Sequence, residues 1–391
     1  MSKIDSRYAI AGVGMSARST NSGKTPLRMA LEASRAALDD AGMRATDIDC
    51  VLSYHENDSC SSHWLATYLG TRASYYNDMH GGGGSTEVLI AEAVGLIEAG
   101  IAKTCLLFRS MNGRSGKRMG GGQTGGGVKV YGSPGAGFLV PYGVSTPGER
   151  YGFLAVRHMH ETGLTERDMG AVAVTVNENA QRNPDARFYG RPLTLEQYLA
   201  EPYVSYPFRR FDYCVETDEA NAIIITSADR ARDCKSHPAY IKAITAHNST
   251  RHAHQYALPN ILEVGGCFAG LRVFEDAGVK PADIQVAAIY DCFTWVVLYQ
   301  LEVYGFVKSG EAGAFASDGQ LKIGGKLPIN TAGGMLDEGY THGMNNVIEL
   351  VRQIRHDYEG TERQVINCEL GMSTGWGGPT SAGAMILERG A

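Results

Sequence analysis

The sequence lacks the features that mark membrane, secreted or nucleic-acid-binding proteins. No stretch approaches the ~20 apolar residues of a membrane span, and the amino terminus leads into a strand-like segment at residues 8–13 without the apolar core of a signal peptide. No long basic run occurs and the net charge is -6, which argues against nucleic acid or an anionic membrane surface as the main partner. We therefore expect a cytoplasmic protein that binds small or acyl ligands.

Paired cysteines are also missing. The eight cysteines are scattered from Cys50 to Cys368 without a Cys-x-x-Cys spacing, so the sequence signals neither a zinc ribbon nor a disulfide framework. His252 and His254 have no third ligand at metal spacing and are expected in a surface loop. We expect reduced, mostly buried thiols and no metal site in this chain.

An internal repeat of helix, glycine stop and strand is present. The first copy has a predicted helix at residues 26–41, then Asp40-Ala41-Gly42, Asp47-Ile48 and a strand at residues 50–54. The second, 236 residues later, has a helix ending at Asp276-Ala277-Gly278, then Asp283-Ile284 and a strand at residues 286–290. The repeat predicts two similar α/β halves, at residues 1–235 and 236–391, each with a mostly parallel sheet.

Further helices and strands follow from apolar spacing. Helices are predicted at residues 87–98, 151–160, 165–182, 294–304 and 344–355, and strands at residues 103–108, 222–226 and 364–368. A glycine-rich insertion at about residues 109–164 interrupts the first half. A long loop inside a compact domain is usually functional or disordered. We favour a mobile pocket loop over a phosphate cradle, because the spacing Gly-x-x-x-x-Gly-Lys-Ser/Thr is missing.

The stretch at residues 330–343 concentrates the features expected of a catalytic loop. Gly333, Gly334 and Gly339 permit turns that other residues resist, and ionisable side chains follow directly. Tyr340 and His342 precede the helix predicted at residues 344–355, where free amide groups favour developing negative charge.

Three motifs resemble those of the thiolase family. Residues 330–343 resemble Asn-x-x-Gly-Gly-x-x-x-x-Gly-His-Pro-x-Gly, with Tyr340 at the histidine and Thr341 at the proline. Tyr290-Asp291-Cys292-Phe293 resembles the His-Asp-Cys-Phe of sterol-carrier-type thiolases. Gly81-Gly82-Gly83-Gly84-Ser85 resembles the nucleophile segment Cys-x-x-Gly-Ser, with Gly81 in place of the cysteine. The resemblance covers essentially the whole chain and implies a duplicated fold with an α-β-α-β-α layering.

The resemblance also implies a site. Tyr290 and Tyr340 are the expected acid/base pair. Because an unperturbed phenol has a pKa of ~10, a neighbour such as Asp291, His342 or the other phenol has to tune one of them. For His342, capping of the helix is the alternative. The resemblance does not say which phenol is the base.

Other residues are candidates for substrate binding. The amides of Gly81 and Gly82, and those of the glycine turn that includes Gly377 and Gly378, are expected to face a thioester oxygen. His80 either orients the thioester or caps a helix. Arg209 and Arg210 are candidates for the phosphates of coenzyme A, or else an ordinary solvated charge pair.

The absence of the cysteine argues against acyl transfer and favours a retro-aldol cleavage of a β-hydroxyacyl-CoA. The pattern resembles the lipid-transfer-protein aldolases of bacterial steroid degradation, which cleave a 17-hydroxy steroid CoA thioester into a 17-ketosteroid and propionyl-CoA. That resemblance implies no permanently bound cofactor, a homodimer, and a heterotetramer with a small zinc-ribbon and OB-fold partner that holds the zinc. The alternatives are a thiolase or acyltransferase with an altered nucleophile, and a non-catalytic acyl-CoA or sterol carrier.

Overall fold

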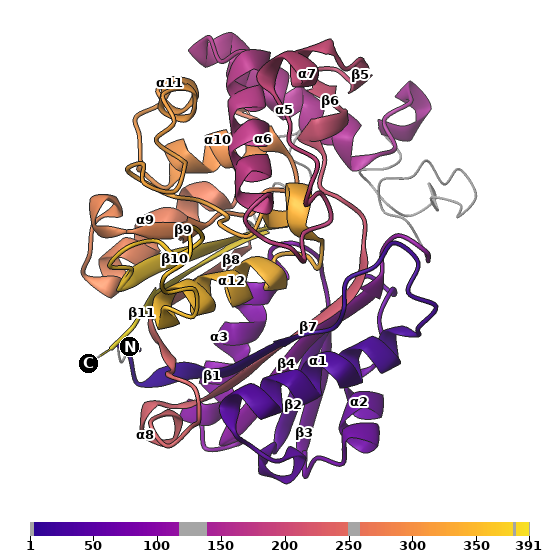
Figure 1. The fold of residues 1–391 in the computed structure, drawn as a ribbon, viewed down its shortest axis with the longest axis vertical. Coiled ribbons are helices and arrows are strands. Elements are labelled where there is room, and N and C mark those ends of the chain that lie inside the picture. The colour runs from indigo at the N-terminus through magenta and orange to yellow at the C-terminus, as the bar shows by residue number, and fades with distance from the viewer. Residues whose placement is uncertain (1–3, 117–138, 249–258, 378–380, 391) are drawn as a thin grey trace.

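Within the described residues, nine strands join into one mixed sheet in the order β3-β2-β4-β7-β1-β8-β11-β10-β9 (Figure 1). The computed structural model describes residues 4–116, 139–248, 259–377 and 381–390. The strands are β1 (Tyr8–Met15), β2 (Cys50–His55), β3 (Tyr75–His80), β4 (Thr104–Asn112), β7 (Asp218–Ser227), β8 (Ala239–Asn248), β9 (Val286–Ala288), β10 (Leu370–Gly377) and β11 (Ser381–Glu388).

The sheet consists of two groups, and the four strands of the second follow the same order as four of the five strands of the first, with β3 as the additional strand. In the first group, β3-β2-β4-β7-β1, every strand runs in one direction except β7. In the second, β9-β10-β11-β8, only β11 is reversed. A short antiparallel pairing of Ala9 with Tyr240 and Ile10 with Ala239 joins the groups edge to edge. The predicted mixed, mostly parallel sheets are confirmed, whereas the division at residues 235 and 236 stays a prediction.

Helices and strand groups alternate in five layers. The inner helices α3 (Ser85–Glu98) and α12 (Met344–Arg355) contact strands of both groups. The helices α1 (Pro26–Ala41) and α2 (Ser62–Leu69) cover the outer face of the first group, and α9 (Gly266–Ala277), on which α10 (Thr294–Val303) packs, covers that of the second. The predicted α-β-α-β-α layering is therefore confirmed (Figure 1).

Burial on both faces explains why the strands read as continuous apolar runs. In β4, Cys105 and Leu107 pack in the core around the inner helices, whereas Leu106 and Phe108 pack in the core beneath α1. Side chains alternate along a strand, so each face of β4 contributes to a different core.

The repeat seen in the sequence is matched by its backbone geometry. Helices α1 and α9 end at Gly42 and Gly278, which both have φ 68. A one-turn 3-10 helix follows each of them, Ala45–Asp47 and Pro281–Asp283, and its last carboxylate accepts from the backbone amide three residues before it. A left-handed glycine is a common helix stop because it carries no Cβ.

The segment between β4 and β7 forms a cap that lies at the top of the view and packs on α10 (Figure 1). It comprises α5 (Pro147–Thr162), α6 (Glu166–Ala180), α7 (Leu195–Ala200) and a ribbon of β5 (Tyr203–Ser205) and β6 (Phe208–Arg209). Helix α6 contacts α10 and α11 (Ala312–Ser317), and it also contacts the π-helical turn Gly334–Glu338. The triple glycines of the predicted pocket loop, with the phosphate-cradle alternative, and the pair His252 and His254 lie outside the described residues.

One predicted strand is wrong. Residues 364–368 form an irregular segment, and β10 begins only at Leu370. The side chain of Gln364 donates to the carbonyl of Gln353 on α12, and Asn367 has φ 55. These local bonds and a left-handed residue prevent strand pairing, although the apolar pattern suggested it. None of the described helices is long and apolar enough to span a bilayer.

Candidate active site

The two predicted tyrosines meet in the interior. The phenol oxygens of Tyr290 and Tyr340 lie 3.2 Å apart, within hydrogen-bonding distance. Tyr290 lies just after Ile289, which follows β9, and Tyr340 lies in the loop before α12, 50 residues further along the chain. Both side chains are buried, Tyr340 being 8% exposed and Tyr290 2% exposed.

A closed ring of hydrogen bonds fixes the backbone of Tyr290. Its amide donates to the hydroxyl of Thr374 over 2.9 Å, and that hydroxyl donates to the side-chain carbonyl of Gln300 over 2.6 Å. The side-chain amide of Gln300 donates back to the carbonyl of Tyr290 over 2.7 Å. Sequence reasoning missed Thr374 and Gln300, which carry no motif and come from β10 and α10.

The glycine floor, Gly81–Gly84, lies beneath the phenols. A Cβ on Gly83 would stand 2.5 Å from the carbonyl oxygen of Trp376 and still closer to the phenol of Tyr290. Glycine is therefore required there, because any side chain would occupy the position of the phenol. Tyr290 covers Gly83, and not Gly81, where the resemblance puts the missing cysteine.

Free amides of the floor lie at the amino end of α3. Within the described ranges the amides of Gly82, Gly83 and Gly84 have no hydrogen-bond partner, while that of Gly81 donates to the carbonyl of His55 over 3.2 Å. The prediction for the Gly81 amide is therefore wrong, since it is already bonded. Unpaired amides at a helix start are suited to an anionic oxygen.

The predicted glycine turn after Trp376 is also wrong in part. Gly377 is the last residue of β10, paired with Ser381, and a Cβ on it would stand 2.8 Å from the amide nitrogen of Gly84. Gly377 thus allows β10 to approach the floor closely. Gly378 lies outside the described residues.

His342 is buried beside the phenols. Its ring centroid lies 4.9 Å from that of Tyr340 in an edge-on arrangement. Its Nδ1 accepts hydrogen bonds from Arg109, whose Nη2 is 3.0 Å and Nε 3.2 Å away. Burial, and then the charge of Arg109, lowers the pKa of His342 to about 3. His342 is therefore a neutral imidazole at physiological pH.

Arg109 and Asp58 were not predicted. Arg109 lies on β4, is fully buried, and forms an ion pair of 2.6 Å with Asp58, which follows β2. The only sequence signal was a charged residue at the end of a strongly apolar strand, since a buried arginine requires a partner. Sequence reasoning also missed Glu56, whose carboxylate oxygen would stand 2.9 Å from a Cβ on Gly82.

Asp291 does not join the phenols. Its carboxylate accepts from the amide of Met335 over 3.0 Å and from the side chain of Asn346 over 3.1 Å. Burial raises the pKa of Asp291 to about 6. Asp291 thus anchors the π-helical turn Gly334–Glu338, and among the described residues no hydrogen bond links its carboxylate to a phenol.

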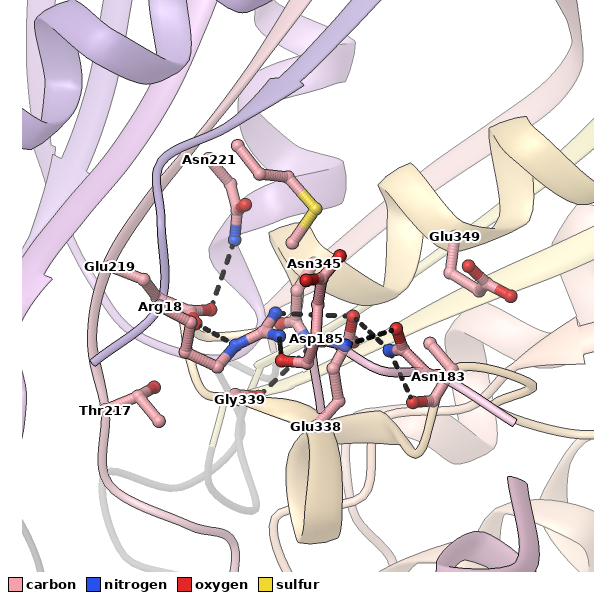
Figure 2. A network of polar contacts seen from close by, with 12 residues as sticks. Arg18, Asn183, Asp185, Thr217, Glu219, Asn221, Glu338, Gly339, Asn345 and Glu349 are labelled. Atoms are coloured by element: carbon pink, nitrogen blue, oxygen red, sulfur yellow. Dashed lines mark hydrogen bonds and ion pairs between the residues drawn. The ribbon is translucent and has the colours of Figure 1, made fainter. Parts of the chain in front are cut away.

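A buried ionic network around Arg18 reaches Glu338 and Gly339, which directly precede Tyr340 (Figure 2). Arg18 forms ion pairs with Glu219 and, over 3.3 Å, with Glu338, and it donates to the carbonyl of Asp185 over 2.6 Å. The amide of Tyr340 donates to the hydroxyl of Thr217 over 2.9 Å. The network joins the segments after β1, after α6 and before β7 to the catalytic loop predicted from the sequence.

Both phenols are protonated at neutral pH. Burial raises the pKa of Tyr290 well above 10, and the neighbouring Tyr340 raises it further. Burial likewise raises the pKa of Tyr340 well above 10, and the nearby Cys214 and Cys292 raise it further, whereas the hydrogen bond with Tyr290 lowers it. Either hydroxyl can donate in the hydrogen bond between the two phenols, so each phenol can stabilise the phenolate of the other.

The remaining candidates are exposed or paired with other groups. His80 is exposed at the end of β3. Arg209 forms an ion pair of 2.6 Å with Glu166 on the cap, and Arg210 is exposed beside it. Arg209 is therefore paired with Glu166 and largely buried, not solvated, and binding of coenzyme A by Arg209 and Arg210 stays a prediction. No group of three metal-ligating side chains gathers in the described part of the chain.

The chain is similar to known proteins with a thiolase-like fold. Residues 247–389 match the family described as Thiolase C-terminal domain-like. The chain is 37% identical to a 17-hydroxy-3-oxo-4-pregnene-20-carboxyl-CoA lyase of Mycobacterium tuberculosis, over 95% of this chain and 98% of the relative. It is 36% identical to a steroid side-chain-cleaving aldolase of Thermomonospora curvata over the full length of both. The solved Ltp2-ChsH2(DUF35) aldolase superposes with a TM-score of 0.89 at 34% identity, over 99% of each chain.

Proposed function

Because the chain belongs to the thiolase-like family of steroid side-chain-cleaving aldolases, we propose that it cleaves a 17-hydroxy steroid CoA thioester to a 17-ketosteroid and propionyl-CoA. It is a carbon–carbon lyase that acts on an acyl-CoA. The observation that carries the proposal is the pair of phenols, 3.2 Å apart, above a glycine floor with unpaired amides.

The pair supplies both proton transfers that a retro-aldol cleavage needs. As a phenolate, Tyr340 takes the proton of the β-hydroxyl, the bond between the α- and β-carbons breaks, and its electrons pass to the thioester as an enolate. Tyr290 then gives its proton to the α-carbon. The proton of the β-hydroxyl thus ends on Tyr340, and the phenol proton of Tyr290 ends on the α-carbon of propionyl-CoA. A proton shift along the 3.2 Å hydrogen bond restores the starting state.

The free amides supply the second requirement, which is a place for negative charge. The enolate oxygen is stabilised by the amides of Gly82 and Gly83 at the start of α3. Donors that are fixed before the reaction stabilise charge without reorganisation in the transition state. Oxyanion stabilisation by these amides replaces the role for Gly81 that the sequence suggested.

The alternative of an altered nucleophile has little support in the site. Ser85 is the hydroxyl closest to the missing cysteine, and a Cβ on Gly81 would touch its oxygen. In the described portion of the protein no base accepts a hydrogen bond from that hydroxyl. A serine without a base is a weak nucleophile.

We also propose that the chain forms a homodimer and recruits a small zinc-ribbon and OB-fold partner to give a heterotetramer, with any zinc in the partner. The name of the solved neighbour joins Ltp2 to a second protein, ChsH2(DUF35). An exposed aromatic cluster on α2 and the edge strand β3 supports an association surface, since large exposed apolar patches often mark interfaces. Its members are Trp64, Tyr68 and Tyr76, each more than half exposed.

Replacement of each phenol by phenylalanine tests the proposal. We expect Tyr290→Phe and Tyr340→Phe each to lower turnover by about 1,000-fold, because each removes a proton-transfer group. Tyr189→Phe, at a half-exposed tyrosine of the cap loop, is the matched control and should leave turnover unchanged. The assay follows propionyl-CoA and 17-ketosteroid release with the partner supplied.

The same assay separates the alternatives. Near-normal turnover in both phenylalanine variants would contradict the assignment of the phenols. A covalent acyl group found by intact mass would favour the altered nucleophile. Tight binding of the thioester without product over long incubation would favour a carrier.

A further inference from the structure

The hydrogen bonds around His342 fix its tautomer. An arginine side chain is always a donor because it cannot be deprotonated in a protein. Two nitrogens of Arg109 lie 3.0 and 3.2 Å from Nδ1 of His342, so Nδ1 has to present its lone pair. In a neutral imidazole the remaining hydrogen is then on Nε2.

The position of the ring is fixed as well as its tautomer. Asp58 holds Arg109 through the 2.6 Å ion pair. The carbonyl of His342 accepts from the hydroxyl of Thr86 over 3.2 Å and from that of Tyr54 over 3.3 Å. The backbone of His342 has φ 53, a left-handed conformation that few residues with a Cβ adopt. A strained backbone conformation of this kind persists only where the surrounding contacts hold it in place.

The nitrogen that carries the hydrogen faces the floor. A Cβ on Gly82 would stand 3.5 Å from Nε2, so Nε2 borders the space that this glycine leaves open. Among the residues that the structure describes, Nε2 has no hydrogen-bond partner. The unpaired amide of Gly82 lies on the same residue.

We propose that His342 is a neutral Nε2–H donor to the thioester oxygen of the bound acyl-CoA, and that Arg109 and Asp58 are positioning residues that impose this tautomer. The assignment rests on the proposed lyase function. His342 then acts together with the Gly82 amide on the oxygen where the enolate charge develops. A donor aimed at developing charge contributes more in a site from which water is excluded than in solution.

Several groups determine the charge of His342, and together they keep it neutral. Burial and Arg109 disfavour the imidazolium, whereas the carboxylate of Asp58 favours it. The other ionisable side chains that face the ring are Tyr54, Tyr340 and, across Gly82, Glu56. The carboxylate of Glu56 competes with the thioester oxygen for the Nε2 hydrogen, because Glu56 and Nε2 of His342 lie on the same side of Gly82.

Two amide variants separate a donor from a capping residue. In His342→Gln the side-chain amide reaches the position of Nε2, whereas in His342→Asn it reaches only that of Nδ1. Asparagine adopts a left-handed backbone more readily, so a capping or purely structural role would favour His342→Asn. We expect His342→Asn to lower turnover about 100-fold and His342→Gln to restore much of it. Equal activities, or a more active asparagine variant, would overturn the proposal.

A bound thioester tests the donor without turnover. The probe is the steroid thioester that lacks the β-hydroxyl, with a 13C-labelled carbonyl, bound to the full chain with its partner. We expect the infrared carbonyl band of this probe to lie lower on the wild-type and His342→Gln proteins than on His342→Asn. Equal band positions would overturn the donor role even if cleavage is confirmed. Failure of the probe to bind any of the proteins would overturn the proposed function together with the inference.

The tautomer can be tested on the free protein. With 15N-labelled histidine and the His342→Gln protein for assignment, we expect His342 to show a bare Nδ1 and a protonated Nε2, unchanged between pH 5 and 8. In the double variant Asp58→Asn/Arg109→Met, which removes both buried charges together, the Nδ1–H tautomer or a titration in this range should appear. A wild-type His342 that titrates there, or that carries its hydrogen on Nδ1, would overturn the proposal whatever the reaction.

Discussion

Substitution of Gly83 by alanine tests whether the floor and the phenol pair form one unit. A Cβ at this position would stand 2.5 Å from the carbonyl oxygen of Trp376, and ordinary contact begins at 3.4 Å, so the two must separate by about 0.9 Å. The Trp376 backbone belongs to β10 and its amide donates to the carbonyl of Gly83, so it has little freedom. The phenol of Tyr290, which is closer still, has to move further and leaves the 3.2 Å contact with Tyr340.

A displacement of this size is large for a catalytic group, because a shift of 1 Å can lower a rate by about 100-fold. We expect Gly83→Ala to reduce turnover by at least that factor, and to destabilise the fold by about 1–3 kcal/mol through overpacking. The assay follows propionyl-CoA release, with circular dichroism and urea unfolding to separate the two effects. Gly95→Ala is the control, because in the described part of the chain no atom outside the backbone of its own helix lies within 4 Å of its Cβ position.

The double variant Gly83→Ala/Tyr290→Phe tests whether the alanine lowers turnover by displacing the phenol of Tyr290. If the alanine acts through the phenol, Gly83→Ala should lower turnover little further once Tyr290→Phe is present, since the two changes affect the same interaction. A fully additive loss would show that the methyl group acts elsewhere. Turnover of Gly83→Ala within threefold of the wild type would show that the floor does not hold the pair.

Three further predictions concern pH and stability. Because burial raises the pKa of Tyr340 well above 10, kcat/KM should rise about tenfold per pH unit from pH 7 to 9, and a plateau near pH 7 would contradict a phenolate base. Arg18→Met should lower the free energy of unfolding by about 3–5 kcal/mol, because it leaves the buried carboxylates of Glu219 and Glu338 without their ion pair. The control is Arg157→Met on the surface, which should change the free energy of unfolding by less than about 0.5 kcal/mol. Urea unfolding measures both. Burial raises the pKa of Glu87 from 4.5 to about 7, so the folded state binds its proton more tightly and stability falls as pH rises through this range. Glu87→Gln should remove this pH dependence of stability and be more stable than the wild type above pH 7 by up to about 3 kcal/mol. A Glu87→Gln protein that is less stable than the wild type at pH 8 would contradict a buried carboxyl that is neutral in the folded state.

The sequence alone determined the repeat and most of the elements, because these depend on local patterns. The helices predicted at residues 26–41 and 344–355 are α1 and α12 with the same bounds, and the glycine stops at Gly42 and Gly278 have the same geometry. Apolar spacing and glycine conformation act over a few residues, so a single chain reveals them. The failure at residues 364–368 came from a side chain of that segment that bonds to α12.

The pairing of Tyr290 with Tyr340 was expected only through family motifs, since no local rule links residues 50 positions apart. The tertiary structure decided the rest. It paired the amide of Gly81 with His55, assigned Asp291 to an anchoring role, and brought Arg109 from β4 to His342. The physical reason is that hydrogen-bond partners and burial depend on which distant segments pack together. The sequence therefore determined which side chains are present, and packing decided their charge states, tautomers and free donors.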